Sequence, residues 1–226
     1  MKFLVWYEKL KLAFLQLFFP NFCCVCNTPL SYNKCICDKC YNILEKGRIK
    51  KPRRRTIYGK RFRIHSIYSY EKDNEASDIV KKLKYSKSFN GSNFMGKAIA
   101  AKARSLRKQY DCITFVPMFP LSEYIRSFNH CEYICSCVAK ELGVKEKSCL
   151  RKVRLTLNQH NLSSVDRRRN LKGAFRARSG VEGKSILLVD DVTTTGSTMS
   201  ECANELYKKG AKNVTMIAFA LTQRKR

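Results

Sequence analysis

The sequence predicts an α/β protein, with a mainly parallel β-sheet flanked by helices and a small cysteine-rich module in front of it. Strand-like and helix-like segments alternate through the larger, C-terminal part of the 226-residue chain. The strand-like segments include short, uninterrupted apolar runs, as in sheets buried on both faces. Half of the twelve cysteines gather near the N-terminus, which sets the module apart from the sheet. The length suits one good-sized domain and a small module.

We expect three regions along the chain. Residues 1–46 hold an N-terminal helix and the cysteine-rich module, residues 47–63 are a basic connector, and residues 64–226 form the α/β domain. Apolar residues recur through Met1–Phe19 as in an amphipathic helix, but its uninterrupted apolar piece, Leu12–Phe19, is too short to span a bilayer. With no secretory signal visible, we predict a cytoplasmic protein. The first helix would pack on the chain itself or a partner, or attach to a membrane surface.

Each element predicted within residues 64–226 depends on a local pattern. β-Branched, aromatic and other apolar residues dominate the segments that we predict as strands: Ile64–Tyr70, Cys112–Val116, Ser185–Val189 and Val214–Leu221. Helical patterns predict helices at Ala76–Tyr85, Asn93–Arg107, Cys131–Leu142 and Met199–Lys209. Gly143 is expected to cap the third of these helices. Strands that alternate with helices in this way pair in parallel.

Four N-terminal cysteines form two pairs with the spacing of metal-binding knuckles. Cys23-x-x-Cys26 and Cys37-x-x-Cys40 can each place two thiolates on one ion, and the ten residues between the pairs allow a short ribbon. Four thiolates favour tetrahedral Zn²⁺ in a structural site with no open position for chemistry. Cys24 and Cys35 are additional thiols at a less usual spacing, and the alternative to a zinc site is a set of reduced, buried thiols.

The other cysteines are dispersed, and several lie in apolar patterns. We interpret them as small core residues. They are Cys112, Cys131, Cys135, Cys137, Cys149 and Cys202.

The charge balance predicts a polyanionic partner. Lysine and arginine number 45 against 18 aspartate and glutamate, a formal net charge of +27. Nucleic acid is the first candidate and an anionic membrane surface the second. The residues expected to contact nucleic acid lie in the basic connector and in a second basic stretch between residues 151 and 175: Lys51, Arg53, Arg54, Arg55, Arg154 and Arg167. Cations of the second stretch would equally suit a pyrophosphate group.

The most informative motif is Ile186–Thr198, in which a buried apolar run ends in two carboxylates and a hydroxyl-rich loop precedes a helix. Ligands bind open α/β sheets at the carboxyl ends of strands, where Asp190 and Asp191 are expected. The loop offers backbone N–H groups, hydroxyls and a glycine at a helix N-terminus, which favours a phosphate. The pattern therefore predicts a site for a phosphorylated sugar.

This motif resembles the ribose-5-phosphate-binding signature of type I phosphoribosyltransferases. The resemblance implies a phosphoribosyltransferase-like sheet and a pocket for phosphoribosyl pyrophosphate (PRPP), bound together with Mg²⁺. The acid pair would hold the 2′- and 3′-hydroxyls of the ribose, and the loop would hold the 5′-phosphate. The PRPP-binding residues that it implies are Asp190, Asp191, Thr193, Thr194, Thr195, Gly196, Ser197 and Thr198.

The order of zinc knuckles followed by this domain resembles the ComF/ComFC family of competence proteins over nearly the whole chain. The matching pieces are Phe19-Pro20-Asn21-Phe22-Cys23, Leu83-Lys84-Tyr85, Val116-Pro117, Arg126-Ser127-Phe128-Asn129, Arg154-x-Thr156-x-x-Gln159-x-x-Leu162 and Gly173-Ala174-Phe175. Ser127 departs from the family, which usually has glycine there.

The resemblance implies a protein that binds single-stranded DNA during natural transformation, at the inner face of the cytoplasmic membrane and beside the DNA-uptake machinery. A PRPP pocket is retained in this interpretation. The alternative is an active phosphoribosyltransferase that uses PRPP and Mg²⁺ with an unidentified acceptor. Glutamine-dependent chemistry is not expected, because the chain lacks the N-terminal glutaminase domain of the glutamine-using relatives.

Overall fold

The computed structural model describes residues 20–31, 34–57, 59–70, 75–85, 89–119, 129–156 and 170–222. The helix expected at Met1–Phe19 lies outside the described residues. So do Arg126–Phe128 of the family motif and Arg167 of the expected nucleic-acid contacts.

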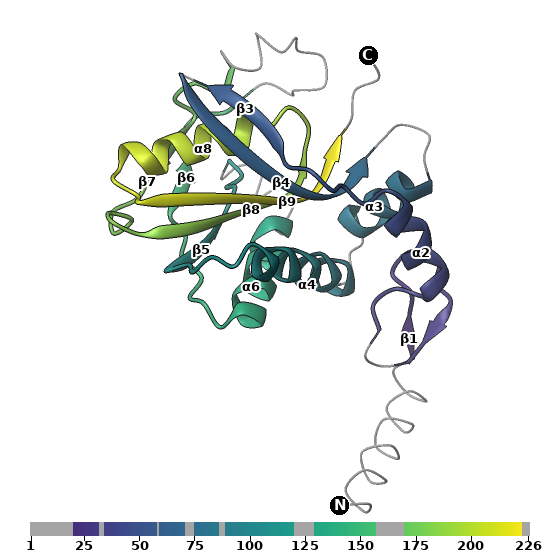
Figure 1. The fold of residues 1–226 in the computed structure, drawn as a ribbon. Coiled ribbons are helices and arrows are strands. Elements are labelled where there is room, and N and C mark those ends of the chain that lie inside the picture. The colour runs from purple at the N-terminus through teal and green to yellow at the C-terminus, as the bar shows by residue number, and fades with distance from the viewer. Residues whose placement is uncertain are drawn as a thin grey trace, which may run out of the picture.

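A five-stranded sheet forms the centre of the molecule, in the order β3-β4-β9-β8-β5 (Figure 1). The first strand of this order pairs antiparallel with its neighbour, and the other four run parallel. The bounds are β3 Arg53–Ile57, β4 Lys60–Tyr70, β5 Cys112–Phe115, β8 Ser185–Thr193 and β9 Asn213–Thr222. The sheet confirms the predicted mainly parallel α/β class.

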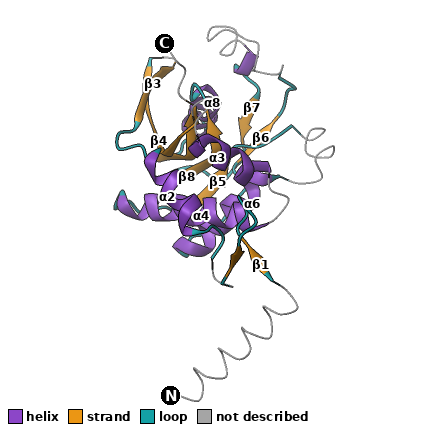
Figure 2. Ribbon diagram, turned by 90° about the vertical axis from the view of Figure 1, so that its right-hand side faces the viewer, coloured by secondary structure: helices purple, strands orange, loops and turns teal. Residues whose placement is uncertain are grey.

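Helices cover both faces of this sheet (Figures 1 and 2). One face carries α3 (Glu75–Tyr85), α4 (Phe89–Ser105) and α6 (His130–Leu142). The other face carries α8 (Ser197–Lys208) and a small antiparallel pair, β6 (Leu150–Lys152) and β7 (Phe175–Ala177). Two apolar cores result, one on each face. Among the described residues, no helix combines the length and the apolar character needed to cross a bilayer.

Strand β8 shows why the apolar run was a reliable signal. Its side chains from Ile186 to Val189 are fully buried and alternate between the two cores, because successive residues of a strand point to opposite faces. Ile186 and Leu188 pack under α8, whereas Leu187 and Val189 pack against the helices of the other face. The strand continues past the expected end, through the acid pair to Thr193, which pairs with Leu221 of β9.

The cysteine-rich module consists of a two-stranded ribbon and one helix. The ribbon pairs β1 (Asn21–Phe22) with β2 (Pro29–Leu30), and α2 (Asp38–Lys46) follows it. The ribbon lies beyond α2, away from the main sheet (Figures 1 and 2). Cys23, Cys40 and Leu44 belong to the same core as α3 and α4, so the module is packed onto the sheet domain.

A partly buried polar contact also joins this module to the sheet. Glu45 at the end of α2 accepts hydrogen bonds from Arg48 and from the Tyr68 hydroxyl of β4, the latter at 2.7 Å. The Arg48 guanidinium lies 5.3 Å from the centre of the Tyr68 ring. These contacts, the Arg48 bonds above all, hold the pKa of the Glu45 carboxyl below its ordinary value of 4.5.

Replacing Glu45 by glutamine is expected to lower the free energy of unfolding by about 1–2 kcal/mol at neutral pH, because the charge that strengthens its hydrogen bonds to Arg48 and Tyr68 is removed. A carboxyl whose pKa falls on folding contributes stability above pH 4.5, and this contribution disappears as pH falls through the folded-state pKa. Denaturant titrations should therefore show that the free energies of unfolding of the unaltered chain and the Glu45→Gln variant differ less at pH 3.5 than at pH 7. Asp78→Asn is the matched control, since its pair with Lys81 is exposed; an equal effect in both variants would contradict this role of Glu45.

The basic segment 47–63 contains sheet structure that the sequence did not predict. Arg53–Ile57 forms β3, and β4 begins at Lys60 rather than at Ile64. A run of arginines does not by itself favour a strand. The strand β3 forms because its backbone pairs with β4, from Arg53 opposite Ile64 to Ile57 opposite Lys60. The helices and the remaining main strands predicted within residues 64–226 are confirmed with small shifts at their ends. Gly143 caps α6 at a φ of 65°, as expected.

Candidate functional site

Asp190 and Asp191 lie near the carboxyl end of β8, at the edge of the sheet where such folds bind ligands. They are only 8% and 7% exposed. Each carboxylate accepts the backbone N–H of the next residue, with Asp191 N 2.9 Å from Asp190 Oδ1 and Val192 N 2.5 Å from Asp191 Oδ1. These bonds fix the two acids side by side as hydrogen-bond acceptors.

Cys131 lies beside this acid pair, a contact that the sequence did not predict. It is the second residue of α6, and its Sγ lies 3.5 Å from Asp190 Oδ1. One ligand atom from each of Cys131, Asp190 and Asp191 falls within 4.8 Å of the others. Cys131 therefore lines the site formed by Asp190 and Asp191, in addition to packing in the core. Cys131 and Asp190 are 59 positions apart in the sequence, so no local pattern predicts this contact.

The loop after β8 has a geometry that can accept an anion. Gly196 precedes α8 at a φ of 77°, a left-handed conformation that glycine adopts without strain. Gly196 has no side chain to cap α8, the first turn contains no acidic residue, and Thr195 Oγ1 accepts the Ser197 N–H at 3.3 Å. Thr195 Oγ1 and Ser197 Oγ lie 2.8 Å apart, and both side chains are buried at the turn. Amides and hydroxyls are thereby gathered at the positive end of a helix dipole.

The structure brings all of the predicted PRPP-binding residues together, since Asp190, Asp191 and the segment Thr193–Thr198 are continuous around the end of β8. One cation from a distant part of the sequence reaches the same place. Arg53 Nη1 donates to the backbone carbonyl of Thr194 at 2.6 Å, across 141 residues of sequence.

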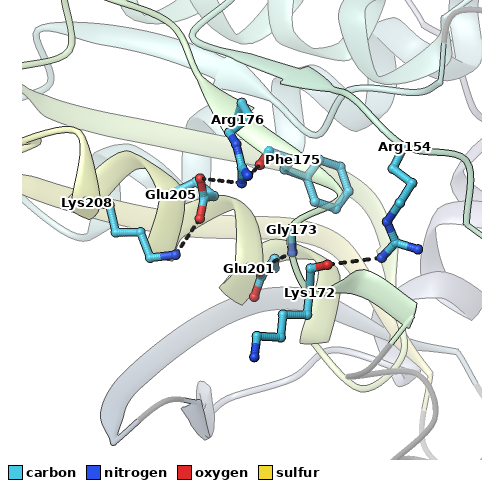
Figure 3. A network of polar contacts seen from close by, with 8 residues as sticks. All are labelled: Arg154, Lys172, Gly173, Phe175, Arg176, Glu201, Glu205 and Lys208. Atoms are coloured by element: carbon cyan, nitrogen blue, oxygen red, sulfur yellow. Dashed lines mark hydrogen bonds and ion pairs between the residues drawn. The ribbon is translucent and has the colours of Figure 1, made fainter.

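A polar network between α8 and the segment around β7 involves another of the predicted cations (Figure 3). Arg154 donates to the carbonyls of Asn170 and Lys172, at 2.8 and 3.0 Å. Arg154 therefore links the beginning of the segment that connects β6 to β7 with the end of that segment. Glu201 of α8 accepts the Gly173 N–H at 3.2 Å, so the same segment is anchored to the helix that follows the loop after β8.

Glu205 continues this network one turn further along α8. Its carboxylate lies 2.7 Å from Lys208 Nζ and 3.5 Å from Arg176 Nη1, and the glutamate is buried (Figure 3). A buried carboxylate needs such partners because its desolvation is otherwise costly. The network positions β7 against α8 and hence supports the loop at the start of that helix.

The remaining predicted nucleic-acid contacts are partly placed. Lys51 and Arg54 are exposed, Arg54 at the edge of the sheet and Lys51 just before it. Arg55 lies in the same edge strand, β3. These residues share one edge with Arg53, whereas Arg154 lies in the separate network above.

The four predicted zinc ligands converge in the structure. The sulfur atoms of Cys23, Cys26, Cys37 and Cys40 all lie within 4.8 Å of one another. Cys37 is the N-cap of α2 and accepts the N–H of Cys40 at 3.4 Å, so the second pair spans the first turn of a helix. The Cys26 and Cys37 sulfurs are 3.6 Å apart, which suits two ligands of a tetrahedral metal–sulfur site. The cluster can hold a metal ion, and its donors fit zinc.

The other thiols lie outside this cluster. Burial is the main cause that raises the pKa of Cys24, to about 12, and it also raises the pKa of Cys35. Burial likewise raises the pKa of Cys135 and, with Asp190 and Glu201 nearby, that of Cys202. Thiols held protonated in this way are poor nucleophiles. Apart from Cys131, their positions agree with core packing.

Comparison with known proteins identifies the domain. The phosphoribosyl transferase domain family matches residues 132–226. A DNA utilization protein YhgH from Salmonella typhi is 41% identical over 105 residues, and this match spans 46% of each chain, less than half of the relative's length. The protein of the same name from Escherichia coli O6:H1 is 28% identical over 204 residues, or 85% of this chain and 86% of the relative.

Two further proteins are similar to this chain. Competence protein F of Haemophilus influenzae is 25% identical over 153 residues, covering 64% of this chain and 67% of that protein. Among solved structures, a glutamine PRPP amidotransferase from B. subtilis matches with a TM-score of 0.41 and 20% identity, over 60% of this chain and 29% of that one.

The parallel sheet, the acid pair and the loop before α8 define a type I phosphoribosyltransferase-like domain with an N-terminal cysteine cluster. Relatives named for competence and for DNA utilization are similar to this chain over much of their length. Together with the phosphoribosyl transferase domain and the cysteine cluster, these relatives support a protein of the ComF type.

Proposed function

We propose that this protein binds single-stranded DNA during natural transformation and retains a PRPP-binding pocket. The observation that carries the proposal is the basic edge of the sheet, Lys51 to Arg55, in a chain with a net charge of +27 and relatives named for competence and DNA utilization. Cations along an extended edge match the spaced phosphates of a flexible strand. We place this activity in the cytoplasm, at the inner face of the membrane and beside the DNA-uptake machinery.

The PRPP pocket is proposed on the geometry at the end of β8. Asp190 and Asp191 would accept the ribose hydroxyls, and the turn Thr193–Thr198 would donate to the 5′-phosphate. PRPP carries Mg²⁺, which neutralises part of the pyrophosphate charge when the ligand is bound. Zn²⁺ in the cysteine cluster would have a structural role, since four thiolates leave no open coordination position.

One observation favours the alternative function, an active phosphoribosyltransferase. The acid pair and the loop would together accept a ribose 5-phosphate, and Cys131 lies against the acid pair. Release of pyrophosphate from PRPP in the presence of candidate acceptor bases would reveal this activity.

Replacing Lys51, Arg54 and Arg55 together by alanine is expected to weaken binding of a single-stranded oligonucleotide about tenfold near physiological salt. The plot of log affinity against log salt should also become flatter, by roughly 0.7 for each phosphate that the variant no longer neutralises. Fluorescence anisotropy with matched single- and double-stranded oligonucleotides over a salt series measures both effects, and we expect a preference for the single strand.

The matched control removes the same charge elsewhere. Lys140, Lys145 and Lys212 are exposed and lie outside the edge strand, so their joint replacement by alanine should leave the affinity nearly unchanged. Equal losses of affinity in both triple variants would show that binding depends on net charge alone. Unchanged affinity and slope in the Lys51, Arg54 and Arg55 variant would reject the proposed edge.

A further inference from the structure

Arg53 lies where the two proposed binding sites meet. It belongs to β3, the edge strand that carries the proposed DNA contacts, and its Nη1 lies 2.6 Å from the carbonyl oxygen of Thr194 in the proposed phosphate loop. Contacts between α8 and β3 place the whole basic strand beside the helix that begins at this loop. The two sites are therefore adjacent in space.

The register of the sheet explains why Arg53, and not its neighbour, reaches the loop. Arg53 is paired with Ile64, whose side chain is buried in the core beneath α8. Residues directly opposite in an antiparallel pair project to the same face, so the Arg53 side chain lies on the α8 side of the sheet. Arg54 projects to the opposite face, where it is exposed.

The contact leaves most of the binding capacity of this guanidinium in place. Arginine has five N–H donors and a permanent charge, and the bond to Thr194 uses one donor and meets a neutral acceptor. No acidic side chain pairs with Arg53 among the residues that the structure describes. A half-buried cation held by a carbonyl is thus positioned for an anion in the loop or along the strand.

We propose that Arg53 is shared by the phosphoribosyl pocket and the single-strand site, so that PRPP and single-stranded DNA bind antagonistically. This inference depends on the proposed function, because it requires both ligands to bind. A phosphate in the loop and a phosphodiester on β3 would draw on the same guanidinium, and two neighbouring anions repel. Linkage then requires each ligand to weaken the other by the same factor.

The test is a titration of the zinc-loaded full chain with a labelled single-stranded oligonucleotide, at fixed ionic strength, with and without saturating PRPP and Mg²⁺. We expect PRPP to raise the apparent Kd for the oligonucleotide at least fivefold. The reciprocal titration of PRPP by calorimetry should show the same factor when the oligonucleotide is saturating.

Two matched variants locate the effect. Arg53→Gln should weaken both ligands and reduce the PRPP effect on the oligonucleotide to less than twofold. Arg54→Gln should weaken the oligonucleotide alone and keep the full PRPP effect, because this side chain lies on the other face. Arg53→Lys retains the charge and should recover part of both affinities, which separates loss of the cation from loss of the fold.

Failure of this inference is distinguishable from failure of the proposed function. If both ligands bind to the unaltered chain and neither affects the other, the shared role of Arg53 is wrong and the proposed function stands. An antagonism that persists undiminished in Arg53→Gln would also overturn the assignment. If either ligand does not bind to the unaltered chain, the proposed function is wrong, and the shared role of Arg53 is then wrong as well because it requires both ligands to bind.

Discussion

Replacement of both Asp190 and Asp191 by asparagine is expected to lower the affinity for PRPP by about 10²- to 10⁴-fold. Each carboxylate would lose a charge-assisted hydrogen bond to a ribose hydroxyl, and such bonds contribute about 1.5–3 kcal/mol each. Isothermal titration calorimetry with PRPP and Mg²⁺ measures the loss directly. Retained binding in the double variant would reject the pocket.

The fold of this variant should survive, which makes the result interpretable. Asparagine keeps an oxygen that can accept the N–H of Asp191 or Val192, and it removes the repulsion between two buried neighbouring charges. Thermal melting should therefore be unchanged or slightly higher. Asp111→Asn is the matched control: Asp111 accepts the Ser185 N–H at the opposite end of β8, so its replacement should leave PRPP binding intact.

Replacement of Cys37 and Cys40 by serine is expected to abolish metal binding and to destabilise the protein by several kcal/mol. The metal-to-protein ratio should fall from about one to near zero by elemental analysis, because only two of the four thiolates remain. The destabilisation should spread beyond the cluster, since Cys40 and Leu44 pack into the same core as α3 and α4. Denaturant unfolding measures this effect as a lower free energy of unfolding of the variant than of the unaltered chain.

Serine is itself a good N-cap, so Cys37→Ser preserves the start of α2 and isolates the contribution of the metal. The double variant Cys24→Ser with Cys35→Ser is the matched control. Both thiols lie outside the group of four, and this variant should retain a ratio near one. A metal-free natural chain that melts like the metal-loaded one would contradict the structural role of the cluster.

Much of this architecture could be predicted because its signals are local. The apolar run at 186–189, the alternation of strands and helices, and Gly143 at the end of α6 each depend on a few neighbouring residues. The acid pair and the hydroxyl-rich loop form one continuous segment, so their proximity followed from the sequence. The cysteine pairs were equally local, since Cys37 and Cys40 share one helical turn.

The features that the sequence did not indicate depend on contacts between distant segments. β3 exists because its backbone pairs with β4, not because arginines favour strands. Strands β6 and β7 are short and pair across a long connection, from Lys152 to Phe175. The contact of Cys131 with Asp190 and that of Arg53 with Thr194 join residues 59 and 141 positions apart.

The two outer strands of the sheet have a consequence for self-association. An exposed strand edge is a template for pairing with another copy, and proteins protect such edges with charge or with covering chain. The edge at β5 is covered: Ile113 exchanges backbone hydrogen bonds with Lys145 and Lys147, at 3.0 and 2.9 Å. The edge at β3 carries three consecutive arginines instead. The arginines that we assign to a polyanion therefore also repel a second copy, which keeps the sheet at five strands and guards the protein against aggregation through that edge.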